Sequence, residues 1–117
     1  MARSFVADFE KRLLMFEEEL KGLVLFLFKR KDENTTYEIG SYLSRHSTEF
    51  MKLKKYNRVK AWYRLRKTLE NLEEEGILRK EISVENVKDL KFLNYRWIKL
   101  ELLNHALNLL IYRITLD

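Results

Sequence analysis

Apolar residues recur at three- and four-residue steps through the N-terminal part of the chain. This spacing puts them on one face of an amphipathic helix. The residues of this stripe are Phe5, Phe9, Leu13, Phe16, Leu20 and Leu23 or Val24. Gly22 is expected to bend or split the helix, with 23–31 as a more buried second piece.

A short helix, Tyr37–Ser44, is predicted next, with Thr36 as its N-cap residue. Residues 45–56 follow no clean period, which indicates a loop or a poorly defined helical turn. Over 57–74 the helical spacing is clear again. The apolar face of this helix carries Trp62, Leu65, Leu69 and Leu72. Gly76 then stands where a helix C-cap needs a positive φ.

Two β-prone segments follow this helix and predict a hairpin, with strands at 77–83 and 93–100 and the residues between them as a wing. The leucines after the wing also fit a helical spacing, so 90–114 has a second interpretation as one long helix. The run Tyr95-Arg-Trp-Ile98 is β-prone and favours a strand, followed by an apolar helix over 101–115.

These elements predict a mainly α-helical fold with a small β-hairpin, in the α+β class. A chain of 117 residues is large enough for one hydrophobic core but not for two, so a single domain is expected. Its three parts are an N-terminal helix at 1–20, a core at 21–101 and a C-terminal helix at 102–117.

Positive charge is concentrated between Arg45 and Lys67. This segment holds nine Lys and Arg residues against one acid, Glu49, a net charge of +8, whereas the whole chain carries only +5. The rest of the chain is therefore net negative, at −3. Concentrated positive potential beside aromatic and amide side chains is typical of a protein that binds a polyanion. The alternative is a solvated helix face with ordinary surface lysines.

A helical wheel of 57–74 puts the basic side chains of its first half opposite the apolar face, whereas the second half is acidic. This polarity suits a recognition helix whose N-terminal part enters the DNA major groove. The candidate base contacts are Asn57, Lys60, Tyr63, Arg64 and Lys67. The candidate phosphate contacts are Arg45, Lys52, Lys54, Lys55 and Arg58. The candidate wing contacts, which are interspersed with acids, are Arg79, Lys80, Lys88, Lys91 and Arg96.

The order of helix, short helix, basic helix, strand, wing, return strand and apolar helix resembles winged helix-turn-helix transcriptional regulators. The residues that carry the resemblance are Leu65-x3-Leu69-x2-Leu72-x3-Gly76-Ile77-Leu78 and the return strand 95–101. In style the chain is similar to small archaeal and archaeal-virus regulators and to the PadR- and MarR-like families. The resemblance implies a winged-helix fold, double-stranded DNA as the partner, and terminal helices that serve in dimerisation.

The apolar character of both terminal segments supports the homodimer that the resemblance implies. A helix that is apolar on most sides, as 102–114 is, must be buried by its own chain or by a partner. The candidate interface residues are Phe5, Phe9, Leu13, Phe16, Leu103, Leu107, Leu110 and Ile114. The alternative is that both ends of the chain pack on each other within one molecule.

Enzymatic activity is not expected from this sequence. His46 and His105 are isolated, and no Gly-rich phosphate loop or nucleophile motif occurs. The absence of cysteine excludes a disulfide framework and a thiolate metal site. The longest apolar run, Leu23–Phe28, is far shorter than the roughly 20 residues of a bilayer span. We therefore expect a soluble, cytoplasmic protein with no cofactor, no metal and no membrane partner, whereas a small-molecule effector stays an open question.

The function predicted from the sequence is that of a double-stranded DNA-binding transcriptional regulator. Helix 57–74 is expected to lie in the major groove, and the wing region 77–100 on the adjacent backbone or minor groove. Two alternatives stay open. One is a winged-helix adaptor that binds protein partners, and the other is a non-specific architectural or plasmid-partition DNA binder.

Overall fold

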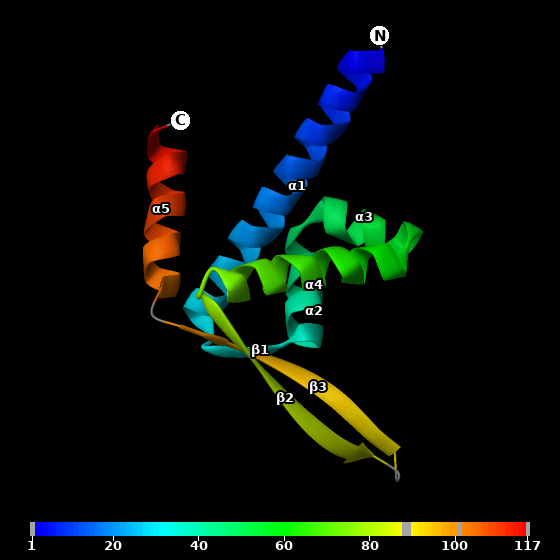
Figure 1. Ribbon diagram of the computed structural model, residues 1–117, viewed down its shortest axis with the longest axis vertical. Helices are drawn as coiled ribbons and strands as arrows, with labels where there is room; N and C mark the ends of the chain where they lie inside the picture. Colours follow the sequence, from blue (N-terminus) through cyan, green and yellow to red (C-terminus); the bar gives the residue numbers. More distant parts are fainter. Residues whose placement is uncertain (1, 88–89, 101, 117) are drawn as a thin grey trace.

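The computed structural model describes the backbone of residues 2–87, 90–100 and 102–116, and side chains within 10–82, 95–100 and 103–110. In these residues it has five helices and a three-stranded antiparallel sheet of order β1-β3-β2. The elements are α1 Ala2–Arg30, β1 Glu33–Thr35, α2 Thr36–His46, α3 Thr48–Tyr56, α4 Arg58–Glu74, β2 Leu78–Val87, β3 Leu90–Lys99 and α5 Leu102–Leu116 (Figure 1). The prediction of a mainly helical α+β chain is confirmed.

Helix α1 runs without interruption through Gly22, so the expected bend or split was wrong. One glycine inside a helix costs only about 1 kcal/mol relative to alanine. Burial of Leu20, Val24 and Phe28 on both sides of it outweighs that cost. Gly22 instead lies under α5, because a Cβ at this position would be in van der Waals contact with Leu110, at 3.6 Å.

The N-terminus of α2 is closed by a capping box, and its N-cap residue is Thr35 rather than the predicted Thr36. The Thr35 hydroxyl accepts a hydrogen bond from the Glu38 backbone N–H at 3.1 Å, and the Glu38 carboxylate accepts one from the Thr35 backbone N–H at 3.3 Å. A hydrogen bond from the Lys31 side chain lowers the pKa of the Glu38 carboxyl. The prediction missed by one residue because both positions are threonine.

Residues 48–56 form the helix α3, and the expected loop or loose turn was wrong. The Ser47 hydroxyl caps this helix by accepting a hydrogen bond from the Phe50 backbone N–H at 3.1 Å. Phe50 is buried and Leu53 is half-buried, while Met51 is exposed. The apolar stripe of α3 is therefore only two side chains wide, which is why the sequence pattern looked irregular.

Helix α4 agrees with its prediction, and Asn57 is its N-cap residue. The helix ends before Gly76, which has the expected positive φ of 76°. Its buried face is wider than the apolar spacing indicated, because Ala61 and Thr68 are buried along with the leucines. Trp62, expected inward, is only half-buried. The helix is therefore rotated about its axis relative to the prediction.

The chain beyond Gly76 is strand followed by helix, so the single long helix over 90–114 is excluded. The strands β2 and β3 are longer than predicted, since Val84 pairs with Leu93 and Val87 with Leu90. Residues that were expected in a long connecting wing therefore belong to the hairpin. The short strand β1 was not predicted; it pairs with β3 through Asn34 opposite Trp97.

The molecule is elongated, with principal extents of 56 × 34 × 24 Å. Its radius of gyration is 16.0 Å, whereas a compact domain of this length has about 13 Å. The first half of α1 and the end of α5 project at one end, and the β2–β3 hairpin projects at the other (Figure 1). Within the described residues, no helix has the length and apolar character needed to cross a membrane.

Candidate nucleic-acid interface

The exposed face of α4 is centred on Tyr63, with Val59 and Arg66 one turn to either side. Arg64 lies at the edge of this face and turns toward α1. Its guanidinium is 3.5 Å from the Glu17 carboxylate, and its side chain is 22% exposed, against 66% for Arg66. Arg64 therefore lies on the α1 side of the helix, and its assignment as a base contact stays a prediction.

The other predicted base contacts divide between the two sides of α4. Lys60 and Tyr63 are exposed. Lys67 lines a cavity of about 160 Å³ between α1 and α4, together with Arg64. The Asn57 carboxamide oxygen accepts the hydrogen bond of the Lys60 backbone N–H at 3.1 Å. Asn57 therefore caps α4, and its assignment as a base contact stays a prediction.

The hairpin has two chemically different faces. Residues directly opposite each other in an antiparallel pair share a face, and Arg79, Glu81 and Arg96 lie on the outer one. The Glu81 carboxylate pairs with Arg79 at 2.9 Å. The Glu33 carboxylate of β1 pairs with Arg96 at 3.4 Å. These two predicted wing contacts therefore point away from α4 and are partly neutralised.

Lys80 lies on the inner face of the hairpin, with Ile82, Tyr95 and Trp97. Its ammonium is 5.5 Å from the Tyr95 ring centroid and 5.8 Å from that of Trp97. Of the three predicted wing contacts whose side chains the structure describes, Lys80 is the one that faces α4. Lys88 lies outside the described residues, and so does the side chain of Lys91.

The inner face of the hairpin and the hairpin side of α4 enclose a groove of about 590 Å³, named here the α4–hairpin groove. Its lining residues are Thr36 of α2, Val59, Trp62, Tyr63, Arg66, Leu69 and Glu70 of α4, Lys80 of β2, and Tyr95 and Trp97 of β3. The floor is held by a hydrogen bond from the Trp97 indole N–H to the Thr36 hydroxyl at 2.9 Å.

Trp62 connects this groove to the basic residues of α3. Lys54 lies over the Trp62 ring, 5.9 Å from its centroid, and donates a hydrogen bond to the Ser44 hydroxyl at 3.4 Å. Lys54, Lys55 and Arg58 line a second cavity of about 500 Å³ at the junction of α2, α3 and α4. The predicted phosphate contacts thus lie beside the groove, and the other two members of that set, Arg45 and Lys52, are exposed on α2 and α3.

Gly40 of α2 determines where Trp62 lies. A Cβ at Gly40 would be only 2.8 Å from Trp62 Cη2 and 3.0 Å from Cζ3. Gly40→Ala is expected to displace the rigid indole and to lower the free energy of unfolding by about 1–3 kcal/mol, as overpacking does. Urea unfolding measures the loss. Gly22→Ala is the control, because the new methyl group meets Leu110 at an ordinary 3.6 Å. Equal stability of the two variants would contradict this account of Trp62.

Two residues of the interface were missed by the sequence analysis. Arg66 was left out because it follows Trp62 by four residues, and the apolar spacing alone placed Trp62 on the buried side. Treating Ala61 and Thr68 as buried would have corrected the rotation. Tyr95 was missed because it was considered only as a strand former. On a strand, residues two apart share a face, so Lys80 and Ile82 lie on one face of β2, and Tyr95 and Trp97 lie on the same face of β3. This spacing could have placed Tyr95 beside Lys80.

The part of α1 around Gly22 and Leu25 packs against α5 within the chain. Leu103 and Leu107 are buried in the chain's own core, so these two residues are not available to a partner. Leu13, Phe16 and Leu110 are half-buried. The side chains of Phe5, Phe9 and Ile114 lie outside the described residues. Two apolar residues that were not predicted, Leu14 and Met15, are exposed on α1.

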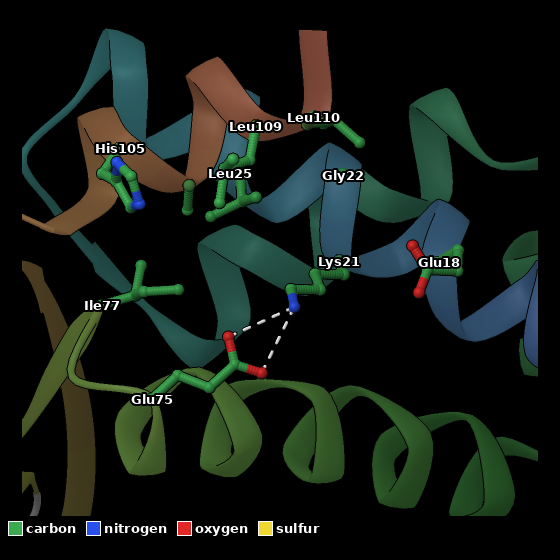
Figure 2. Close-up of a pocket in the computed structure, with 10 residues that line it drawn as sticks. Glu18, Lys21, Gly22, Leu25, Glu75, Ile77, His105, Leu109 and Leu110 are labelled. Atoms are coloured by element: carbon green, nitrogen blue, oxygen red, sulfur yellow. Dashed lines mark hydrogen bonds and ion pairs between the residues drawn. The ribbon is translucent and has the colours of Figure 1, made fainter. Parts of the chain in front are cut away.

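A cavity of about 230 Å³ lies where α1, α5 and the α4–β2 junction meet (Figure 2). Leu25, Ile77 and Leu110 supply its apolar walls. At its edge the Lys21 ammonium is 3.2 Å from each oxygen of the Glu75 carboxylate. This ion pair joins the middle of α1 to the C-cap residue of α4.

No group of three or more His, Cys, Asp or Glu side chains is arranged to hold a metal ion in the part of the chain that the structure describes. Comparison with protein-family models, with curated proteins and with solved structures finds no match for this chain.

Proposed function

We propose that this chain is a winged helix-turn-helix protein that binds double-stranded DNA as a transcriptional regulator. The order of elements, and a sheet of order β1-β3-β2 whose long hairpin projects beside α4, support the winged-helix assignment. The observation that carries the DNA-binding proposal is the row of exposed basic residues along the first half of α4, next to the inner face of that hairpin.

In this proposal the base-reading residues are Lys60, Tyr63 and Arg66, all exposed on α4. Arg66 has a loose ion pair with Glu70 at 3.9 Å, which surface exposure makes weak. An arginine in this position can bond the O6 and N7 atoms of guanine. Lys55 and Arg58, beside the groove, would bind phosphates and contribute affinity without sequence preference.

We also propose that the protein acts as a homodimer through the projecting parts of α1 and α5. Leu14 and Met15 are 63% and 62% exposed. Together with Leu110 they line an open cavity of about 640 Å³. Large apolar side chains grouped in this way are typical of an interaction surface. In the elongated molecule the rest of the chain leaves Leu14 and Met15 largely uncovered.

Selection of bound DNA from a random duplex pool at near-physiological salt tests this proposal. A palindromic consensus, with half-sites about 34 Å apart or a multiple of one helical turn, is the expected result for a dimer with one α4 in each major groove. Sedimentation of the selected complex gives its stoichiometry. Retention of duplex without a consensus would favour the non-specific architectural or plasmid-partition binder, and no retention of duplex at low salt would contradict DNA binding.

A protein-interaction adaptor is the second candidate function. It is favoured by the exposed apolar side chains Val59 of α4 and Ile82 of β2, at 80% and 58% exposure. Such residues contribute little to phosphate binding. Capture of a defined partner protein that is lost in Val59→Ser, together with no retention of duplex, would select this function.

A further inference from the structure

The α4–hairpin groove is unusually rich in aromatic side chains. Four of its lining residues are aromatic, Trp62 and Tyr63 from α4 and Tyr95 and Trp97 from β3. The chain contains only two tryptophans, and both lie here. One wall comes from a helix and the other from a strand that follows it in the sequence, so tertiary packing creates this aromatic site.

The two tyrosines are the rings that a ligand can reach. Tyr63 is 49% exposed on the helix wall and Tyr95 is 39% exposed on the strand wall, whereas Trp97 is 2% exposed and forms the floor. The cations Arg66 and Lys80 belong to the same two walls. The site therefore combines accessible π-faces with positive charge on both sides.

Base-paired DNA cannot stack on the aromatic rings of such a site. In a duplex the faces of the bases are covered by their neighbours, and a protein meets phosphates, sugars and base edges. Unpaired bases expose their faces, and proteins that bind them combine stacking on aromatic side chains with cations that hold the backbone. The exposed tyrosines between Arg66 and Lys80 have this second chemistry.

We propose that the α4–hairpin groove binds unpaired DNA bases, with Tyr63 and Tyr95 as stacking residues and with Lys80 on the flanking phosphate. The inference rests on the proposed function in that the ligand is DNA, and it specifies the form of that DNA. The preferred ligand is a duplex with a locally unpaired segment, the duplex part on the basic face of α4 and an unpaired base in the groove.

Three labelled DNAs of the same sequence test the proposal: a full duplex, the same duplex with a bubble of about five unpaired bases, and the single strand. Fluorescence anisotropy of the label gives the affinity. Tryptophan emission reports on the groove itself, because both tryptophans of the chain line it. The bubble is expected to bind about 10-fold or more tightly than the duplex and to quench tryptophan emission at saturation.

The variant Tyr95→Leu is expected to lose about 10-fold in affinity for the bubble while keeping duplex affinity within about 2-fold, because only the bubble offers a base to stack. Tyr63→Leu is expected to lose about 10-fold for the bubble as well, and some duplex affinity with it, because Tyr63 also reads the duplex in the proposed function. Tyr63→Phe and Tyr95→Phe keep the ring and are expected to restore bubble affinity. Tyr56→Leu is the matched control, since Tyr56 is exposed at the end of α3 and does not line the groove.

The outcomes separate this inference from the proposed function. Equal affinity for duplex and bubble, unchanged by the tyrosine variants, overturns the inference and leaves duplex binding in place. Binding of the single strand and the bubble without the duplex, lost in the leucine variants, supports the groove proposal and contradicts the duplex-binding function. Binding of none of the three DNAs contradicts both.

Discussion

Trp97→Ala is expected to lower the free energy of unfolding by about 3–5 kcal/mol, the loss typical of deleting a buried aromatic side chain. Trp97 is 2% exposed and belongs to the hydrophobic core, although it lies on a hairpin that projects from the body. Its indole N–H donates to the Thr36 hydroxyl at 2.9 Å. The substitution removes both the packing and the hydrogen bond that join the hairpin to α2. Since domains of this size have about 5–15 kcal/mol in total, much of the stability is at stake.

Urea unfolding followed by circular dichroism measures the loss. Tyr95→Ala is the matched control, because Tyr95 lies on the same strand and the same face but is 39% exposed. We expect this variant to lose less than half as much as Trp97→Ala. Thr36→Val isolates the hydrogen bond, and leaving the buried indole N–H without an acceptor is expected to cost about 1–3 kcal/mol. Similar losses for Trp97→Ala and Tyr95→Ala would contradict the role of Trp97 as the anchor of the hairpin.

The second large effect concerns charge. Replacing the exposed residues Lys52, Lys55 and Arg58 together by glutamine is expected to make the slope of log K against log salt less negative by about 2.7, or about 0.9 for each lost phosphate contact. Over a fourfold rise in salt, the variant would then lose about 40-fold less affinity than the parent chain. Glutamine is a good helix former, so α3 and α4 are expected to persist. Anisotropy titrations of a duplex at several salt concentrations measure the slope.

A charge-matched control separates a contact surface from net charge. Replacing Lys11, Arg12 and Lys29 by glutamine removes the same formal charge from exposed positions of α1, away from the groove. This variant is expected to keep the parent slope. Identical slopes for the two triple variants would mean that Lys52, Lys55 and Arg58 do not contact the phosphates.

Local elements of the fold could be predicted from the sequence because they depend on neighbouring residues. The spacing of the leucines at 65, 69 and 72 identified α4, and the glycine at position 76 identified its end. The strand-prone run around Trp97 indicated β3 correctly, although a helical spacing was also present. The helix α3 could not be predicted in this way. Its hydrophobic face is too narrow to give a period; in the folded chain it packs against α2 and α4 with Phe50 buried.

The candidate site was predictable only in part. Lys60 and Tyr63 lie on the exposed face as expected, whereas Arg64 turns to Glu17 of α1. The prediction treated α4 as an isolated cylinder with its apolar side chains at the centre of the buried face. In the folded chain α1 packs along the edge of that helix that holds Arg64 and Thr68. Ala61 and Thr68 are buried, so the exposed face is centred on Tyr63.

By itself the sequence determined that a basic amphipathic helix is followed by a hairpin and an apolar helix, because periodicity, capping and turn chemistry act within a few residues. The tertiary structure alone decided which basic residues stay exposed and which pair with acids. It also brought Tyr63 and Tyr95 into one groove. Those relations depend on how α4 is rotated and how the hairpin twists beside it. Both are set by contacts between segments far apart in the chain, such as the bond from Trp97 to Thr36.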